Sequence, residues 1–171
     1  MPDDRPDSRP DTPRENRIVT ACVLILGNEI LSGRTADVNL SWLARQLTDL
    51  GIRLREARVV ADVEDDIVAA VNECRARYDY VFTTGGIGPT HDDITSPSIA
   101  KAFGVPWVRH PEAVKILEGM YEPGQLNEAR LRMATVPEGA VLVKNPVSAA
   151  PGFRIGNVYV LAGVPSIMQA M

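Results

Sequence analysis

The sequence predicts an α/β fold with three layers, α/β/α, around a mostly parallel sheet. Two observations support this prediction. Strand-like and helix-like patterns alternate along the chain from residue 17 onward. The strand-like runs at 17–26 and 79–84 are almost continuously apolar, which is typical of strands that helices cover on both faces of the sheet.

The individual elements follow from these patterns. Helices are expected at 36–51, 62–78, 96–104, 111–121 and 126–134, where apolar residues recur at helical spacing. Strands are expected at 17–26, 52–61 and 79–84, and shorter ones at 140–145, 152–155 and 158–163. The domain spans 17–171, and we expect it to be truncated at its carboxy end, because a helix pattern starts shortly before Met171. Residues 1–16 are rich in Pro, Asp and Arg, and we expect a disordered tail there.

Composition narrows the class of protein. The chain has 171 residues, of which 45% are hydrophobic and 23% are charged, as in a globular domain with a full-sized core. The net charge of −4 gives no general attraction to nucleic acid or to an anionic membrane. No apolar run is long enough to span a bilayer, and no signal-peptide pattern is visible. Cys22 and Cys74 lie in apolar runs, so we expect buried thiols and a cytoplasmic location.

Three transitions from strand to loop carry both glycines and polar residues: 24–39, 81–95 and 159–168. Ligands of open parallel sheets bind beyond the carboxyl ends of the strands, where such loops meet. A glycine directly after a strand lets the backbone approach a ligand where a Cβ would block it. The candidate residues are Gly27, Glu29 and Ser32 in the first turn and Gly163, Pro165 and Ser166 in the third. Glu29 is expected to face the ligand, and Ser166 either caps the last helix or contacts the ligand.

The second turn contains Gly85, Gly86 and Gly88 between a buried strand and a helix. Successive N–H groups without side chains are a common phosphate-binding device, and the amino terminus of the following helix adds partial positive charge. The alternative is a tight turn without a ligand. No Lys follows the glycines as in a P-loop, and the spacing differs from the dinucleotide-binding Gly-x-Gly-x-x-Gly pattern.

Carboxylates follow these glycines at Asp92 and Asp93, where they would repel a phosphate. A Mg²⁺ ion held by them would remove the conflict, because Mg²⁺ binds one or two carboxylates together with phosphate oxygens. Asp92, Asp93 or Thr95 could instead cap the helix at 96–104. Asp62 also has two interpretations, as an N-cap for the helix at 63–78 or as a second carboxylate at this edge of the sheet. His91 stays unassigned.

These residues resemble a known family. The stretch "TTGGIGPTHDDIT" (83–95) is similar to the signature of the molybdopterin-binding domain family of molybdenum cofactor biosynthesis. "GNEILSGRTADVN" (27–39) and "GVPSIM" (163–168) resemble the amino-terminal domain of competence/damage-inducible protein A (CinA). The three motifs occur in the expected order, and the resemblance covers residues 18–171. It implies the α/β/α fold and a homo-oligomer, such as a dimer or trimer.

The resemblance also implies a ligand and a chemistry. The ligand is molybdopterin or a related phosphorylated pterin or nucleotide, bound with Mg²⁺ or another divalent cation. The residues implied for phosphate binding in this turn are Thr83, Thr84, Gly85, Gly86, Gly88 and Thr90. Asp93 and Asp62 correspond to aspartates needed by molybdopterin adenylyltransferases, and CinA-type domains hydrolyse a nucleotide pyrophosphate such as ADP-ribose, or FAD in related enzymes. Binding without turnover is the other reading, because Asn28 stands where CinA-like sequences often carry Asp.

Overall fold

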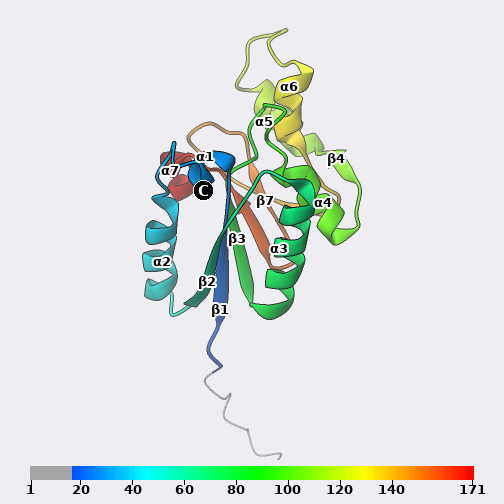
Figure 1. Cartoon of the computed structure of the whole chain (residues 1–171). Coiled ribbons are helices and arrows are strands. Elements are labelled where there is room, and N and C mark those ends of the chain that lie inside the picture. The colour runs from blue at the N-terminus through cyan, green and yellow to red at the C-terminus, as the bar shows by residue number, and fades with distance from the viewer. Residues whose placement is uncertain (1–16) are drawn as a thin grey trace, which may run out of the picture.

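A six-stranded sheet forms the centre of the structure, a computed structural model that describes residues 17–171 (Figure 1). The tail expected at 1–16 lies outside the described residues. In chain order the elements are β1 (Thr20–Leu26), α1 (Asn28–Leu31), α2 (Asn39–Asp49), β2 (Arg53–Val60), α3 (Glu64–Arg77), β3 (Tyr80–Thr84), α4 (Thr95–Phe103), β4 (Trp107–Arg109), α5 (Pro111–Glu118), α6 (Glu128–Leu131), the 3-10 helix η1 (Arg132–Ala134), β5 (Thr135–Pro137), β6 (Val141–Val143), β7 (Gly152–Ile155), β8 (Val158–Leu161) and α7 (Pro165–Ala170).

The strand order is β2-β1-β3-β8-β7-β6. Strands β2, β1, β3 and β8 are parallel to one another, β7 is antiparallel to β8, and β6 is antiparallel to β7. This confirms the predicted mostly parallel sheet. The parallel strands end at the same level, since Ile25 of β1 pairs with Thr84 of β3 and Thr84 pairs with Leu161 of β8. The loops that follow these three strands therefore leave the sheet side by side, as the sequence predicts.

Two apolar layers hold helices against the two faces of the sheet. On one face, α3 and α4 pack on β1, β3 and β8 through buried residues such as Ile67, Ile99 and Val160. On the other face, α2 and α7 pack on the same strands through Leu43 and Met168. The residues of β1 alternate between these layers, so the strand is buried on both sides. That double burial explains its almost uniformly apolar sequence.

The two cysteines lie in the first of these layers. Cys22 and Cys74 are fully buried, and their Sγ atoms are 3.3 Å apart without a covalent bond. Burial raises the pKa of the Cys22 thiol, with the neighbouring Cys74 thiol adding to the shift. The expectation of two buried thiols is confirmed.

Some local predictions differ from the structure. The sequence does not predict α1, which is a single helical turn, or the antiparallel pair β4–β5, whose three-residue strands are defined by their pairing with each other. The expected helix at 126–134 is a single turn, α6, continued by η1. None of the helices described for residues 17–171 is both long and apolar enough to cross a membrane.

The capping predictions for α4 are wrong. The N-cap position is Ile94, whose side chain makes no capping hydrogen bond. The Thr95 and Ser96 hydroxyls instead donate to the Gly85 and Thr135 carbonyl oxygens, both at 2.9 Å. These hydroxyls therefore bond to carbonyl oxygens of neighbouring segments, and the first turn of the helix has no side-chain cap.

Candidate functional site

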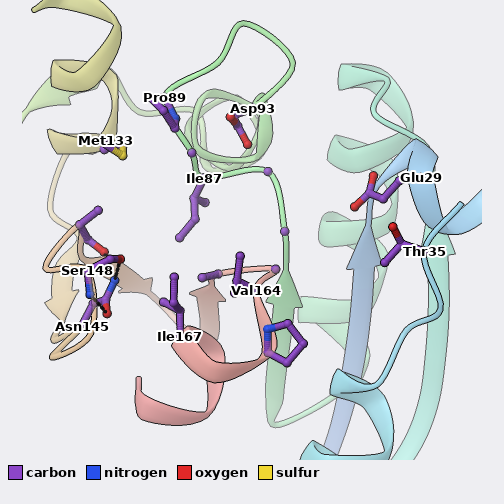
Figure 2. A pocket seen from close by; sticks show the side chains of 17 residues that line it. Glu29, Thr35, Ile87, Pro89, Asp93, Met133, Asn145, Ser148, Val164 and Ile167 are labelled. Atoms are coloured by element: carbon purple, nitrogen blue, oxygen red, sulfur yellow. Dashed lines mark hydrogen bonds between the residues drawn. The ribbon is translucent and has the colours of Figure 1, made fainter.

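A cleft of about 510 Å³ opens where the three predicted turns meet (Figure 2). Its lining residues come from the turn after β1, the glycine turn after β3, η1, the β6–β7 loop, the turn after β8 and the start of α7. They are Glu29, Thr35, Gly85, Gly86, Ile87, Gly88, Pro89, Asp93, Met133, Asn145, Ser148, Ala150, Ala162, Gly163, Val164, Pro165 and Ile167. The volume is in the range of small-molecule sites.

The glycines of the second turn are required by packing. A Cβ on Gly85 would overlap the Leu26 carbonyl oxygen, and a Cβ on Gly86 would overlap Thr95 Oγ1. Both residues also have positive φ, 101° and 69°. A Cβ on Gly163 would be 3.1 Å from Gly85 Cα, so the second and third turns touch through their glycines. Glycine is therefore needed here whether or not a ligand binds.

The same turn still offers hydrogen-bond donors. Among the described residues, the N–H groups of Gly86, Ile87 and Gly88 donate to no protein acceptor, whereas that of Gly85 donates to the Leu161 carbonyl oxygen at 3.2 Å. Three successive free donors in a turn without a Cβ at two of the positions form the kind of concavity that binds anions. The turn that the sequence predicts to bind phosphate therefore has three backbone donors without an acceptor among the described residues.

Asp93 lies in the cleft lining. Its Oδ2 accepts from the Thr90 backbone N–H at 2.9 Å and from the Thr90 hydroxyl at 2.6 Å. A Cβ on Gly88 would be 2.7 Å from this oxygen, so Gly88 makes room for the carboxylate. Asp93 thus closes the loop between the glycines and α4 and has a second oxygen, Oδ1, that accepts no hydrogen bond within residues 17–171.

Asp92 lies apart from Asp93. Its side chain is 74% exposed, does not line the cleft, and pairs with Nε2 of the 93% exposed His91 at 2.7 Å. Within residues 17–171 no group of three His, Cys, Asp or Glu side chains is arranged to hold a metal ion. The structure does not bring Asp92 and Asp93 together as the pair of metal ligands that the sequence predicts.

Asp62 is engaged elsewhere. Its Oδ2 accepts from the Asn28 N–H at 2.8 Å, and its own N–H donates to Asn28 Oδ1 at 3.2 Å. The N-cap position of α3 is Val63 without a side-chain bond, so the capping alternative for Asp62 is wrong. Asp62 is not part of the cleft lining either. Asn28 and Asp62 connect the turn after β1 to the turn after β2.

The remaining predicted residues divide into two groups. Glu29, Gly163 and Pro165 line the cleft, as do the three glycines of the second turn. The residues outside the lining are Gly27, Ser32, Thr83, Thr84, Thr90 and Ser166. Thr83 and Thr84 are buried in β3, Ser32 donates to the Glu29 carbonyl oxygen at 3.3 Å, and Ser166 does not cap α7, whose N-cap position is Val164.

The β6–β7 loop supplies a wall of the cleft that the sequence does not predict. Its organiser is Asn145, which is buried and accepts from the N–H groups of Val147 and Ser148. Its Nδ2 donates to Ser148 Oγ at 2.7 Å and to the Ala150 carbonyl oxygen at 2.9 Å. Ala149 has φ 51°, a conformation that favours glycine. The signal in the sequence was Asn-Pro followed by small residues between two short strands.

Comparison with known proteins identifies the family. The family described as "Probable molybdopterin binding domain" matches residues 22–171. A protein from Pyrobaculum calidifontis is 44% identical over 158 residues, covering 89% of this chain and 60% of the relative. A CinA-like protein from Anaeromyxobacter dehalogenans is 39% identical over 149 residues, 84% of this chain and 36% of the relative. This chain therefore spans less than two thirds of the length of these relatives.

Solved structures agree with this assignment. The protein CinA from Thermoplasma acidophilum, described as of unknown function, superposes with a TM-score of 0.84 at 36% identity, covering 90% of this chain and 93% of that one. The tungsten cofactor synthesizing protein MoaB from Pyrococcus furiosus shares the fold at 19% identity, with a TM-score of 0.56 over 90% of this chain and 88% of that one. On the sequence match, the cleft-forming turns and the CinA superposition, the chain belongs to the molybdopterin-binding domain family and is of the CinA type.

Proposed function

We propose that the cleft binds a phosphorylated pterin or nucleotide, such as molybdopterin, together with a divalent cation. The observation that carries this proposal is the combination of free N–H groups with carboxylates in one cleft. Its described lining contains no Lys, Arg or His, and its two ionisable residues are Glu29 and Asp93. The N–H groups would hold the phosphate, and a cation would offset its repulsion from the carboxylates.

The cleft has a polar side, at Glu29 and Thr35, and a mostly apolar side that also carries Asn145 and Ser148, which fits a ligand with two chemically different ends. Figure 2 shows Glu29 and Thr35 on one side of the glycine turn and Asn145 and Ser148 on the other. Apolar side chains line the space on the second side: Ile87, Pro89, Met133, Val164 and Ile167. A phosphate would occupy the glycine turn while a flat heteroaromatic ring packs on the apolar side chains.

Calorimetry on the purified chain tests this proposal. Molybdopterin, ADP-ribose, FAD and ATP would each be titrated with and without Mg²⁺. We expect saturable binding of at least one of them that weakens when Mg²⁺ is removed. If none of them binds in either condition, or if binding proceeds equally well in the presence of excess chelator, the proposed function is wrong.

A second candidate is turnover, as a metal-dependent nucleotide pyrophosphatase or a molybdopterin adenylyltransferase. The observation in its favour is Asp93, which lies in the cleft with one carboxylate oxygen free of partners among residues 17–171. Such an oxygen could hold a metal-bound water or orient an attacking group. Asp62 supports this reading only indirectly, through its hydrogen bonds to the turn that carries Glu29.

Asp93→Asn is the variant that separates binding from turnover. Asn keeps an oxygen for the Thr90 donors, so the loop and the fold should persist. If the domain is an enzyme, product formation from ADP-ribose or FAD falls by about 100-fold or more. Wild-type protein that binds these ligands with Mg²⁺ but forms no product would exclude turnover of them while leaving the binding function intact.

A further inference from the structure

The two cysteines of the chain face each other between the sheet and α3, away from the cleft. Cys22 lies in β1, and Cys74 lies on the buried face of α3 together with Ile67 and Val71. Their Sγ atoms are 3.3 Å apart, with the Cys22 thiol as the donor, and both side chains are 0% exposed. Neither cysteine lines the cleft, so the proposed function makes no use of this pair.

The distance brings the two sulfur atoms within reach of a covalent bond. Bonded sulfur atoms in a disulfide are about 2 Å apart, so an approach of roughly 1.2 Å from the observed separation is sufficient. The two residues are 52 positions apart in the sequence and belong to a strand and to the helix that covers it. Their contact therefore depends on the native packing of α3 on β1.

The surroundings of the pair make one thiol the better nucleophile. Burial raises the pKa of both thiols, which slows their reaction with an oxidant. For Cys74, the hydrogen bond from Cys22 and the positive charge of Arg58 act in the opposite direction. For Cys22, the hydrogen bond with Cys74 raises the pKa further. Cys74 should consequently react first, and its partner is already in contact with it.

We propose that Cys22 and Cys74 are a site of reversible oxidation to an intramolecular disulfide, with hydrogen peroxide as the oxidant. The Cys74 sulfur attacks one peroxide oxygen, the O–O bond breaks, and the leaving hydroxide takes the thiol proton as water, which leaves a sulfenic acid on Cys74. The Cys22 sulfur then attacks the Cys74 sulfur, the S–O bond breaks, and a second water leaves with the Cys22 proton. Two thiols and one peroxide thus become one disulfide and two water molecules.

Access and reversal both require only small molecules. Hydrogen peroxide is close to water in size, so a local opening of α3 away from the sheet is enough to admit it. Dithiothreitol reverses the reaction by thiol–disulfide exchange and is itself oxidised to its cyclic disulfide.

The cross-link should stabilise the fold. It would tie β1 to α3 and close a loop that spans 52 positions of the unfolded chain. Closing such a loop lowers the entropy of the unfolded state, so we expect the oxidised protein to have a Tm about 5–10 °C higher than the reduced protein.

Mass spectrometry on the folded chain tests the inference. The reduced protein is treated with hydrogen peroxide and then denatured in the presence of N-ethylmaleimide before its intact mass is measured. We expect a product that has lost two hydrogen atoms and takes up no N-ethylmaleimide. Its digest should contain the peptides of Cys22 and Cys74 joined to each other, and dithiothreitol should restore both thiols.

Cys22→Val combined with Val23→Cys is the matched control. Val23 is also 0% exposed, but it points to the opposite face of the sheet, so the variant keeps two buried thiols and separates them by the sheet. The separation along the chain is almost unchanged, so oxidation through the unfolded chain would be equally fast in both proteins. We expect the wild-type protein to form the disulfide at least about tenfold faster than the control, whose fold is verified by thermal unfolding.

Four results would overturn the inference: wild-type thiols that do not react, oxidation to sulfinic acid without a link, disulfides between two molecules, or equal rates in the wild type and the control. If the control does not fold, the change in Tm decides. A rise after oxidation supports a disulfide that fits the native packing, and an unchanged or lower Tm contradicts it. These measurements need no ligand of the cleft, so they are independent of the proposed function.

Discussion

Asn28 and Asp62 exchange two hydrogen bonds across neighbouring turns: the Asn28 N–H donates to Asp62 Oδ2 at 2.8 Å, and the Asp62 N–H donates to Asn28 Oδ1 at 3.2 Å. Each residue thereby satisfies a backbone donor of the other. The pair joins the end of β1, which leads into Glu29, to the end of β2. Asp62 thus positions the turn that carries Glu29, and it does so from outside the cleft.

The first prediction follows from this pair. Asp62→Ala removes the acceptor for the Asn28 N–H and should lower the free energy of unfolding by about 1 kcal/mol. Asp62→Asn keeps an acceptor oxygen and should lose less than half of that. Urea unfolding measures both values. If Asp62 were catalytic, the difference would appear in activity: Asp62→Asn would be fully stable but inactive toward any substrate that the wild-type protein turns over.

The second prediction concerns Gly86. Gly86→Ala places a methyl group against Thr95 Oγ1 at a residue with φ 69°. Backbone strain and the overlap together should cost about 2–4 kcal/mol. Gly139→Ala is the matched control, because Gly139 has φ 82° and open space around its Cβ position. It should cost only about 1 kcal/mol, the strain alone.

Thr95→Ala separates the two contributions at Gly86. In that background the hydroxyl that the new methyl group would overlap is gone, so the cost of Gly86→Ala should fall toward that of Gly139→Ala. The double-mutant cycle should therefore show a coupling of about 1–2 kcal/mol between the two positions. Additive costs would mean that the turn relaxes away from α4 without resistance.

The third prediction concerns the wall formed by the β6–β7 loop. Asn145→Ala removes four hydrogen bonds from one buried side chain and should destabilise the loop by about 2 kcal/mol. Asn145→Asp keeps the two accepted bonds and should be less severe. Hydrogen exchange at the N–H groups of Val147 and Ser148 reports on the loop directly: exchange should accelerate strongly in Asn145→Ala. Unchanged exchange would show that Asn145 does not hold the loop.

The layout of the sheet could be predicted because its main strands and helices carry long apolar patterns in the sequence. β1 and β3 are runs of apolar residues, and α2 and α3 repeat apolar residues over eleven and fourteen positions. The glycines of the three turns also stand within two residues of the strand ends, so their convergence at one sheet edge followed from the parallel topology. In contrast, β4 and β5 are defined by their pairing with each other, which a reading of local patterns does not detect.

The sequence could not show which of the predicted polar side chains lie in the cleft lining, because residue type does not say where a side chain points. Asp92 and Asp93 are adjacent and chemically identical, yet the bonds from Thr90 turn Asp93 inward while Asp92 stays exposed. Asn145 is one of several polar residues in its part of the chain, and the sequence does not single it out. Its importance depends on burial and on four hydrogen bonds, and both are properties of the packed structure.

The last prediction concerns a charged cluster on the outer strand and α3, away from the cleft. Arg58 forms ion pairs with Glu56 and with Glu73, the latter at 2.7 Å. Hydrogen bonding to Arg58 lowers the pKa of Glu73 from 4.5 to about 2 and also lowers the pKa of Glu56. The Tyr78 hydroxyl donates a further bond to Glu56.

Both carboxyl groups have a lower pKa in the folded state than in the unfolded chain. Their contribution to stability is therefore complete above a pH of 4.5 and is lost as the pH falls toward 2. Arg58→Met removes the largest cause of both pKa shifts while keeping a side chain of similar length, and the smaller contributions of Arg77 and Tyr78 remain. Its urea midpoint should consequently fall less than that of the wild type between about pH 6 and about pH 3. Tyr78→Phe, which leaves Arg58 in place, should follow the wild-type curve more closely, and parallel curves for all three proteins would show that these ion pairs do not act on the folding equilibrium.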